Sequence, residues 1–465
     1  HAGRENTDLI VILNDNEMSI DTNVGALSEH LSKLRVSDGY QEMKNKIRQV
    51  KNVPGVGEAT YQFLDRVKDS AKSVLIKESG PFEALGFRYI GPVNGHDLDS
   101  LINVFTQVKK MHGPILIHVK TVKGKGYGPA EKDPSGFHGT GSFDLKTGAP
   151  VGKSGKPDYS AVFGRKLLSL AKKDSRICAI TAAMASGTGL SPFRQELPDR
   201  FFDVAIAEQH GVTFSAALAA GGMLPVFAVY STFLQRGYDE LVHDACLENL
   251  HAIFAIDRAG VVGSDGETHQ GIFDLSYLSH LPNMTILSPK NGKELEEMLE
   301  FAIYHVDGPV AVRYPRGTAS EEFSDKQEPL SLGKAEVLQE GEKIAILAEG
   351  HMCSEAVKAA KILEEKGYHP MVVNMRFIKP LDLDLLRKLA EDGLEIFTVE
   401  DNLRAGGLGS KVLEAYSDME LLVKVHNFGF PDRFIEHGTQ AQLLARYGLD
   451  GAGIAARMEK ILEEK

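Results

Sequence analysis

Hydrophobic residues along the chain fall into short runs, and most runs are followed by a polar loop and then by a segment with helical spacing. Residues 159–172 and 293–304, for example, have the 3.6-residue period of an amphipathic helix. Apolar runs between such segments are typical of strands buried on both faces of a parallel sheet. We interpret these runs as strands: 9–13, 115–119, 177–181, 204–207, 226–229, 252–256, 310–312, 344–348, 371–373 and 396–399. The pattern predicts an α/β fold with mostly parallel sheets flanked by helices.

The length of the chain predicts about three domains. The chain has 465 residues, and domains commonly contain roughly 150. Two stretches of low hydrophobicity, 139–157 and 317–330, are the expected boundaries. We therefore expect domains at 1–150, 151–328 and 329–465.

Charge and cysteine content argue against several classes of protein. The chain has 52 Lys and Arg against 64 Asp and Glu, a net charge of -12. This balance argues against a nucleic-acid or anionic-membrane surface and leaves small anionic substrates open. The three cysteines have no metal-site spacing and favour a reducing, intracellular location. The uncharged stretch 209–235 is broken by Gly and Pro at 221–225, which favours a buried helix, a turn and a strand over a membrane span.

Polar side chains gather where the expected strands end. They include Asn16, Lys123, Tyr230, Arg258 and Arg316. Because the carboxyl ends of parallel strands meet at one edge of a sheet, a single cleft can collect them. Any α/β protein places some polar residues there, so position alone leaves function and simple solvation equally open.

Glu208 is the most informative acid in the sequence. It stands between an apolar run and an uncharged helical segment, so its carboxyl group is expected to be poorly hydrated and to share a proton with a ligand nitrogen. The alternative is an ordinary acid at a helix N-terminus. Phe233 is a candidate aromatic plate for a heterocycle, with core packing as its alternative.

The loop at 258–271 combines four glycines with Arg258, Asp265 and His269. Glycines let a backbone approach a ligand closely, and an Asp four residues from a His can orient the imidazole ring. The pattern indicates a binding or catalytic loop, and the alternative is a flexible surface loop.

Four further candidates have weaker support. Lys123 lies in a short basic glycine segment that fits a phosphate contact or a solvated turn equally well. His138 is a candidate catalytic residue, and the alternative is a purely structural role. The Asn16 side chain and the Met18 carbonyl are possible Mg²⁺ ligands, although turn chemistry also explains Asn and Asp at this point. We interpret the glycines at 406–409 as a packing turn.

Taken together, the motifs of this chain resemble the 1-deoxy-D-xylulose-5-phosphate synthase family. They follow the family's order and span essentially the whole chain: LNDNEMSI (13–20), GPVNGHD (91–97), KGKGY (123–127), AIAEQH (205–210), YSTFLQR (230–236), DRAG (257–260), DGETHQG (265–271) and YPRG (314–317). The resemblance implies a transketolase-like, cytoplasmic homodimer that depends on thiamine diphosphate and Mg²⁺. It implies that pyruvate and glyceraldehyde 3-phosphate condense with release of CO₂, for isoprenoid, thiamine and pyridoxal synthesis.

The resemblance also implies the identity of the three domains and the residues around the cofactor. Residues 1–150 would be the C-terminal part of a diphosphate-binding domain, 151–328 the pyrimidine-binding catalytic domain, and 329–465 a C-terminal α/β domain. Glu208 would hydrogen-bond the aminopyrimidine and favour the imino tautomer that removes the thiazolium proton, and Phe233 would stack on the pyrimidine. Met184 would lie near the thiazolium, with Lys123 and His138 near the cofactor and the reacting centre.

Other positions match substrate and metal contacts of the family. Those matching groups that bind the aldehyde phosphate or the carboxylate are Tyr230, Arg236, Arg258 and Arg316, a task suited to guanidinium groups. Asp265 and His269 match a pair that handles protons on the intermediate and the acceptor. The Asn16 side chain and the Met18 carbonyl match two magnesium ligands.

The chain departs from the family in one respect. Members carry a Gly-Asp-Gly motif, with a third magnesium ligand, upstream of the segment that begins here. We therefore expect an incomplete fragment that is inactive by itself. The alternatives are a transketolase, the β subunit of a 2-oxoacid dehydrogenase, or a non-catalytic assembly chain. The 230–236 and 314–317 motifs favour the synthase, and the charged residues of the site argue against a relic.

Overall fold

The computed structural model describes residues 1–18, 80–151, 155–263, 265–324 and 328–464. The chain forms two compact units, His1–Lys153 and Ser154–Lys465. The last two residues of the 13–20 motif and position 264 of the 258–271 loop lie outside the described residues. Whether the second unit divides near 328, as the sequence predicts, remains a prediction.

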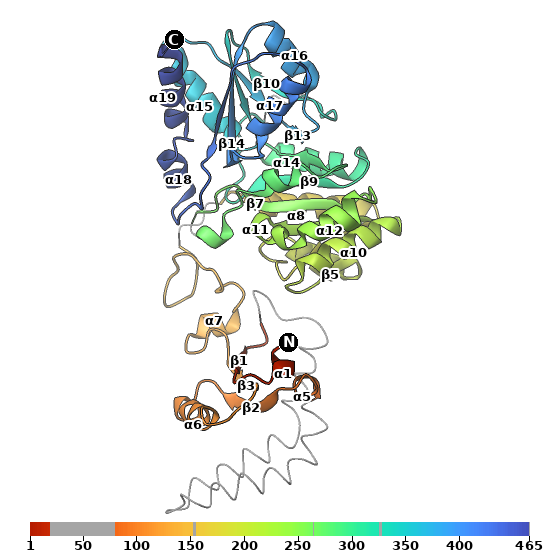
Figure 1. Ribbon diagram of the computed structural model, residues 1–465, viewed down its shortest axis with the longest axis vertical. Helices are drawn as coiled ribbons and strands as arrows, with labels where there is room; N and C mark the ends of the chain where they lie inside the picture. Colours follow the sequence, from red (N-terminus) through yellow and green to blue (C-terminus); the bar gives the residue numbers. More distant parts are fainter. Residues whose placement is uncertain (19–79, 152–154, 264, 325–327, 465) are drawn as a thin grey trace, which may run out of the picture. The chain divides into compact units, whose positions relative to one another are not determined.

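The first unit contains a three-stranded parallel sheet with the strand order β1-β3-β2. Its described elements are α1 (Ala2–Glu5), β1 (Ile10–Asp15), α5 (Gly80–Ala84), β2 (Arg88–Asn94), α6 (Leu98–Val108), β3 (Ile115–Lys120) and α7 (Gly128–Lys132) (Figure 1). A small core of Val108, Ile115, Ile117 and Val119 lies between α6 and the sheet. Asp97 starts α6 by accepting a hydrogen bond from the backbone N–H of Ser100 at 3.2 Å.

The second unit begins with a seven-stranded sheet of order β13-β8-β9-β7-β6-β4-β5, parallel throughout except for β13. Its elements up to β9 are α8 (Tyr159–Lys173), β4 (Ile177–Thr181), α9 (Ser191–Glu196), η1 (Pro198–Arg200), β5 (Phe201–Asp203), α10 (Glu208–Ala220), β6 (Leu224–Tyr230), α11 (Ser231–Leu234), η2 (Gln235–Gly237), α12 (Tyr238–Glu240), η3 (Leu241–Cys246), β7 (Ile253–Ala259), η4 (Glu267–His269), α13 (Asp274–Leu278), β8 (Thr285–Leu287), α14 (Gly292–Tyr304) and β9 (Val310–Pro315).

Both faces of this sheet are covered by helices. Helices α8 and α14 bury alternate strand residues such as Val226 and Ala228. Phe227 points to the opposite face, where it meets α10 at Gly211. This double coverage explains why the central strands are apolar at every position.

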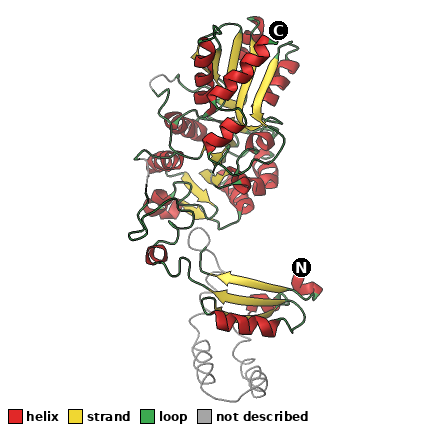
Figure 2. Cartoon of the chain, turned by 90° about the vertical axis from the view of Figure 1, so that its left-hand side faces the viewer, coloured by secondary structure: helices red, strands yellow, loops and turns green. Residues whose placement is uncertain are grey.

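The rest of the second unit is a five-stranded sheet of order β10-β12-β11-β14-β15 with an antiparallel β10 edge. Its elements are β10 (Glu336–Gln339), β11 (Ile344–Ala348), α15 (Met352–Glu364), β12 (Met371–Asn374), α16 (Leu383–Glu391), β14 (Glu395–Leu403), α17 (Leu408–Asp418), β15 (Val425–Phe430), α18 (Gln440–Arg446) and α19 (Gly451–Glu463). Strand β13 (Phe377–Lys379), which follows β12 in the chain, belongs to the seven-stranded sheet. Helices α15 and α19 cover one face, and α16 and α17 cover the other (Figure 1). Figure 2 shows the strands enclosed between these helices.

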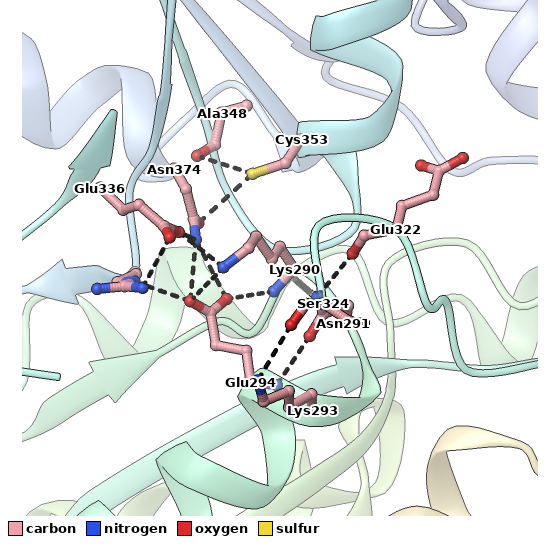
Figure 3. A network of polar contacts seen from close by, with 11 residues as sticks. Lys290, Asn291, Lys293, Glu294, Glu322, Ser324, Glu336, Ala348, Cys353 and Asn374 are labelled. Carbon is pink, nitrogen blue, oxygen red and sulfur yellow. Dashed lines mark hydrogen bonds and ion pairs between the residues drawn. The ribbon is translucent and has the colours of Figure 1, made fainter. Parts of the chain in front are cut away.

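A buried ionic cluster joins the two sheets of the second unit (Figure 3). Lys290 Nζ lies 3.0 Å from Glu294 Oε1 and 2.7 Å from Glu336 Oε2. Arg376 completes the cluster, with Nε 2.8 Å from Glu294 and Nη2 3.0 Å from Glu336. Asn374 donates to Glu294 Oε2 at 3.1 Å. Two cations therefore balance two anions where the first turn of α14 meets β10 and β12.

The predicted α/β fold with mostly parallel sheets is confirmed, but one expected strand is wrong. Residues 204–207 form a loop, and the strand at this point is β5 (Phe201–Asp203). The reason is that Ala205 adopts a φ of 59°, which no strand allows, while Asp203 Oδ1 accepts a hydrogen bond from its N–H. In the uncharged stretch, α10 ends at Ala220 and β6 starts at Leu224. No helix among the described residues has the length and apolarity needed to cross a membrane.

Candidate active site

The loops that follow β4 and β5 lie where the order of successive strands in the seven-stranded sheet reverses. From β4 the chain moves outward to β5 at the sheet edge, and then returns to β6 on the other side of β4. In open parallel sheets, ligands bind at such a switch point, beyond the carboxyl ends of the strands. Met184 follows β4 and Glu208 follows β5, so the fold brings both to this edge.

Asp203 ties these two loops together. Its Oδ1 atom accepts hydrogen bonds from the backbone N–H groups of Ala183 at 2.9 Å and Ala205 at 3.0 Å. Both alanines have a positive φ, 60° and 59°. Non-glycine residues in this region are strained and persist where the surrounding structure fixes them. The loops that carry Met184 and Glu208 are therefore held in one defined arrangement.

Glu208 is the first residue of α10, and only 1% of its surface is exposed. Its Oε1 atom accepts a hydrogen bond from Arg236 Nη1 at 3.3 Å. Its buried Oε2 atom has no hydrogen-bond partner among the residues that the structure describes. Gly211 lets α10 lie close to the sheet, because a Cβ atom there would be 2.6 Å from the Phe227 ring. A buried carboxylate oxygen without a donor is unfavourable, and it marks a place where a ligand can supply an N–H group.

Phe233 connects Glu208 to the rest of the site. Its ring stacks on Tyr230 with centroids 5.7 Å apart and meets the His269 ring edge-on at 5.4 Å. The guanidinium group of Arg236 lies 5.6 Å from the Phe233 centroid. Contacts therefore run from Glu208 through Arg236 and Phe233 to His269.

Arg258 and Arg316 form an excess of positive charge beside these aromatic rings. Both guanidinium groups pair with the same Asp265 oxygen, at 3.1 Å and 3.0 Å. Two cations that share one anion leave a net positive charge, which suits an anionic ligand. Arg258 also lies 3.8 Å above the Tyr230 ring. Burial raises the pKa of Tyr230 to about 12, so its hydroxyl stays protonated at neutral pH and can donate a hydrogen bond.

Two arrangements differ from those expected from the sequence. Asp265 was expected to orient His269, but its carboxylate is taken by the two arginines, and His269 Nδ1 has the Thr268 hydroxyl 2.9 Å away. Charge-assisted pairing of guanidinium groups with a carboxylate is strong, which explains why Asp265 pairs with the arginines. Arg236, expected among the groups that bind the substrate anion, pairs with Glu208, and its side chain is 55% exposed.

The remaining candidates lie in the first unit. Asn16 and Met18 are half-buried, and Asn16 Oδ1 accepts a hydrogen bond from the Met18 N–H at 3.0 Å. This is the turn chemistry that was the alternative to metal binding. Among the described residues, no three His, Cys, Asp or Glu side chains come together as metal ligands. Lys123 is half-buried and His138 is exposed.

A buried chain of polar groups holds the strand end that precedes Asn16. His118 is fully buried in β3, with Nε2 2.9 Å from Asp15 Oδ2 and Nδ1 2.6 Å from the Tyr89 hydroxyl. Asp15 Oδ1 also accepts a hydrogen bond from the Glu17 N–H at 3.0 Å. The backbone around Asn16 is thereby fixed to the three-stranded sheet.

Known proteins with similar sequences cover all regions of the chain. Family models match at residues 1–121 (1-deoxy-D-xylulose-5-phosphate synthase), 155–321 (transketolase, pyrimidine binding domain) and 333–454 (transketolase, C-terminal domain). A 1-deoxy-D-xylulose-5-phosphate synthase from Caldanaerobacter subterraneus is 51% identical over 98% of this chain and 73% of its own length. Synthase 1 of Geobacter sulfurreducens is 49% identical over 100% of this chain and 73% of its own length.

The chain belongs to the 1-deoxy-D-xylulose-5-phosphate synthase family. The resemblance seen in the motifs is therefore confirmed, and the family is one of transketolase-type transferases. Its fold is also that of the transketolases. A split-gene transketolase described as an inactive β4 tetramer has a TM-score of 0.59 and 31% identity, over 66% of this chain and 98% of its own. The transketolase of Campylobacter jejuni has a TM-score of 0.56 and 19% identity, over 99% of this chain and 74% of its own, and shows the fold alone.

The glycines at 406–409 form a packing turn in this synthase-family chain, as expected. The backbone N–H groups of Leu408 and Gly409, at the start of α17, donate to the buried carboxylate of Glu400 at 2.8 Å and 3.0 Å. An internal carboxylate thus takes the place that a phosphate loop would offer to a ligand.

Sequence reasoning missed one acid beside the site, Asp203, and gave no role to a second, Asp257, which it placed among the polar residues after a strand. Asp257 is fully buried in the second half of β7, next to Arg258, and its Oδ2 atom accepts a hydrogen bond from the Ser160 hydroxyl at 2.6 Å. Asp203 is the last residue of β5, and it was missed because the strand was expected at 204–207, which placed Asp203 before the strand instead of at its carboxyl end.

Proposed function

We propose that this protein catalyses the reaction after which its family is named, with thiamine diphosphate as cofactor. Pyruvate and D-glyceraldehyde 3-phosphate would condense to 1-deoxy-D-xylulose 5-phosphate with release of CO₂. The observation that carries the proposal is the buried, unpartnered Oε2 atom of Glu208, connected through Phe233 to a cluster with excess positive charge. The two halves of this arrangement suit a heterocycle and a phosphate.

The surroundings of Glu208 fit an aminopyrimidine. A buried carboxylate can accept a hydrogen bond from a ring N–H, and the half-buried Phe233 ring offers a face for stacking. When bound, thiamine diphosphate supplies a carbon nucleophile and an electron sink for decarboxylation. Glu208 would hold the proton at a pyrimidine nitrogen, and Arg236 would keep its carboxylate oriented. Met184, buried in the loop after β4, is the candidate neighbour of the thiazolium.

The positive cluster would bind the phosphate of the aldehyde or the carboxylate of pyruvate. Arg258 and Arg316 supply guanidinium donors, and the protonated hydroxyl of Tyr230 supplies another. Asp265 would hold the two arginines in position. His269, in edge contact with Phe233, is the candidate for proton transfer to the acceptor, and Arg236 keeps an exposed face for an anion.

For the first unit the proposal rests on the motifs. The Asn16 side-chain oxygen and the Met18 carbonyl are the proposed Mg²⁺ ligands, supported by the rigid strand end before them. Lys123 and His138 are the proposed contacts to the cofactor and the reacting centre. A homodimer and a cytoplasmic location also remain proposals. The first rests on the resemblance, and the second rests on the three free cysteines as well.

The test is an assay of the protein expressed from its complete gene with both substrates, thiamine diphosphate and Mg²⁺. We expect pyruvate-dependent formation of the sugar phosphate and CO₂. Glu208→Gln should lower kcat by at least about 100-fold, a typical effect of losing an acid-base group. The matched control is Glu248→Gln, which changes an exposed acid of the same unit. Full activity of Glu208→Gln, or turnover of a ketose phosphate without pyruvate, would overturn the proposal.

The expectation of an inactive fragment is tested in parallel. The pure 465-residue chain is assayed under the same conditions, and thiamine diphosphate binding is measured by calorimetry. Formation of the sugar phosphate by this chain would contradict that expectation and leave the proposed reaction intact.

A further inference from the structure

The loop that carries Arg258 and Asp265 rests on the region of the five-stranded sheet. Val261, inside the loop, and Ile272, directly after it, are buried in the core of that region together with Ile435 and Leu443. The position of Arg258 therefore depends on a part of the chain far from it in sequence.

Gln440, the first residue of α18, contacts the loop that carries Arg258 and the backbone of Arg316, the two arginines proposed to bind the substrate anion. Its Nε2 atom donates one hydrogen bond to the Val261 carbonyl at 2.7 Å and another to the Arg316 carbonyl at 3.2 Å. A side-chain amide has two N–H hydrogens, and both are used here. A single planar group thus sets the distance between the Arg258 loop and the Arg316 backbone.

Hydrogen bonds of Gln270 and Arg316 also connect the Arg258 loop to its neighbours. Gln270 Nε2 donates to the Glu436 carbonyl at 3.1 Å, and its Oε1 accepts from the Val262 N–H at 2.8 Å. Arg316 Nη1 donates to the Val262 carbonyl at 2.9 Å. The Arg258 loop and the region of α18 are therefore joined by two side-chain amides. Gln440 donates from α18 to the loop, and Gln270 donates from the loop to the segment before α18.

We propose that Gln440 is a positioning residue for the substrate anion, which keeps Arg258 and Arg316 at the separation needed to bind one phosphate together. Both guanidinium groups share Asp265, so a shift of either backbone changes the geometry that an incoming phosphate meets. This inference rests on the proposed function, because it assigns Gln440 to the phosphate side of that site.

The test replaces Gln440 with a residue of similar length that has no N–H donor. Gln440→Met should raise the KM for glyceraldehyde 3-phosphate by about three- to tenfold, because each neutral hydrogen bond contributes a factor of roughly 2 to 12. The kcat should change by less than about twofold, because Glu208 and Phe233 are not contacted. The inhibition constant of inorganic phosphate, measured as a competitor of the aldehyde, should rise by the same factor as the KM.

The matched control is Gln442→Met in the same helical turn. Gln442 accepts a hydrogen bond from the Thr439 N–H at 3.0 Å and completes the capping box of α18, and its side-chain hydrogen bonds among the described residues go to Thr439 and not to either arginine segment. If its loss changes KM as much as the loss of Gln440, the effect comes from the start of α18, and the inference is wrong. Gln440→Lys keeps an N–H donor and should stay near the wild-type KM. If Gln440→Met does not fold, Gln440→Leu, which also lacks a side-chain N–H donor, takes its place and should raise the KM in the same way.

The outcomes separate the two proposals. A wild-type protein that makes no sugar phosphate would refute the proposed function, while phosphate titrations of the variants would still test the positioning role. An active wild type whose Gln440→Met variant has an unchanged KM and phosphate inhibition constant would refute the role of Gln440 and leave the function standing.

Discussion

Replacing the buried acid Asp257 by Asn should change the free energy of unfolding in a pH-dependent way. Relative to the wild type, the variant should be more stable at alkaline pH than at acidic pH. Asp257 lies in the second half of β7 without solvent exposure, and its Oδ1 atom has no hydrogen-bond partner among the described residues. Burial raises the pKa of this carboxyl from 3.8 to about 7, against the opposing effects of the Ser160 hydroxyl and Arg258. Asp158 adds to the increase. Asn has nearly the same shape and stays uncharged.

The sign follows from proton binding in the two states. Between about pH 4 and pH 7 the folded protein keeps a proton on Asp257 that the unfolded chain has released, so stability falls as pH rises through this window and levels off above it. The pKa difference of about 3 corresponds to about 4 kcal/mol in total, at about 1.4 kcal/mol for each pH unit. Between about pH 5 and pH 8, the wild type should lose about 2.5 kcal/mol relative to Asp257→Asn.

The assay is urea unfolding at both pH values, followed by circular dichroism because the chain has no Trp. Comparing the two proteins at each pH cancels all other titrating groups, and comparing the two pH values cancels any constant effect of Asn on packing. Asp199→Asn, a substitution of an exposed acid in the same unit, should show no such pH dependence. A stability difference between wild type and Asp257→Asn that is the same at both pH values would refute the reasoning.

Two further predictions concern the positive cluster and the buried ionic cluster. Arg258→Lys keeps the charge but loses the flat group that stacks on Tyr230, so the KM for glyceraldehyde 3-phosphate should rise about tenfold in steady-state assays, while exposed Arg165→Lys should leave KM unchanged. Glu294→Ala leaves Lys290 and Arg376 without one of their two anions in the buried cluster, and should lower the free energy of unfolding by about 3–5 kcal/mol in urea titrations. Glu300→Ala removes a half-exposed partner of Lys166 and should change it by about 1 kcal/mol or less; equal losses for the two variants would contradict this assignment.

The sequence pattern predicted the central strands of the fold far better than the edge strands. Strands such as β6 and β7 are buried on both faces, so their residues form continuous apolar runs that stand out in the sequence. The strands that were missed are β2, β8, β10, β13 and β15, and all except the three-residue β8 lie at the edge of their sheet. An edge strand has a neighbour on one side only, and β10 reads Glu-Val-Leu-Gln without an apolar run.

The composition of the candidate site was also predictable, because its polar residues follow the apolar runs directly. Glu208, Tyr230 and Arg258 were identified from this position and from the family motifs, and the structure places them in one connected cluster. Their pairing was not predictable. Spacing in sequence suggested that Asp265 would orient His269, but three-dimensional packing brings Arg316, the residue after β9, to within 3.0 Å of Asp265.

Residues that act at long range in the sequence carry no local signal at all. Gln440 reaches the Arg258 loop only because Val261 and Ile272 are buried in the core of the five-stranded sheet region. In the sequence it is one of two glutamines at the start of a short helix, and only the one whose amide faces the arginine segments can position them. The site therefore contains two kinds of residue. Those expected to contact the ligands, such as Glu208 and Arg258, can be recognised from the sequence, whereas those that position them, such as Gln440, can be recognised only from their hydrogen bonds in the fold. Comparing Gln440 with Gln442 tests this distinction directly. The two residues are of the same type and lie in the first turn of the same helix, but only Gln440 donates hydrogen bonds to the two arginine segments.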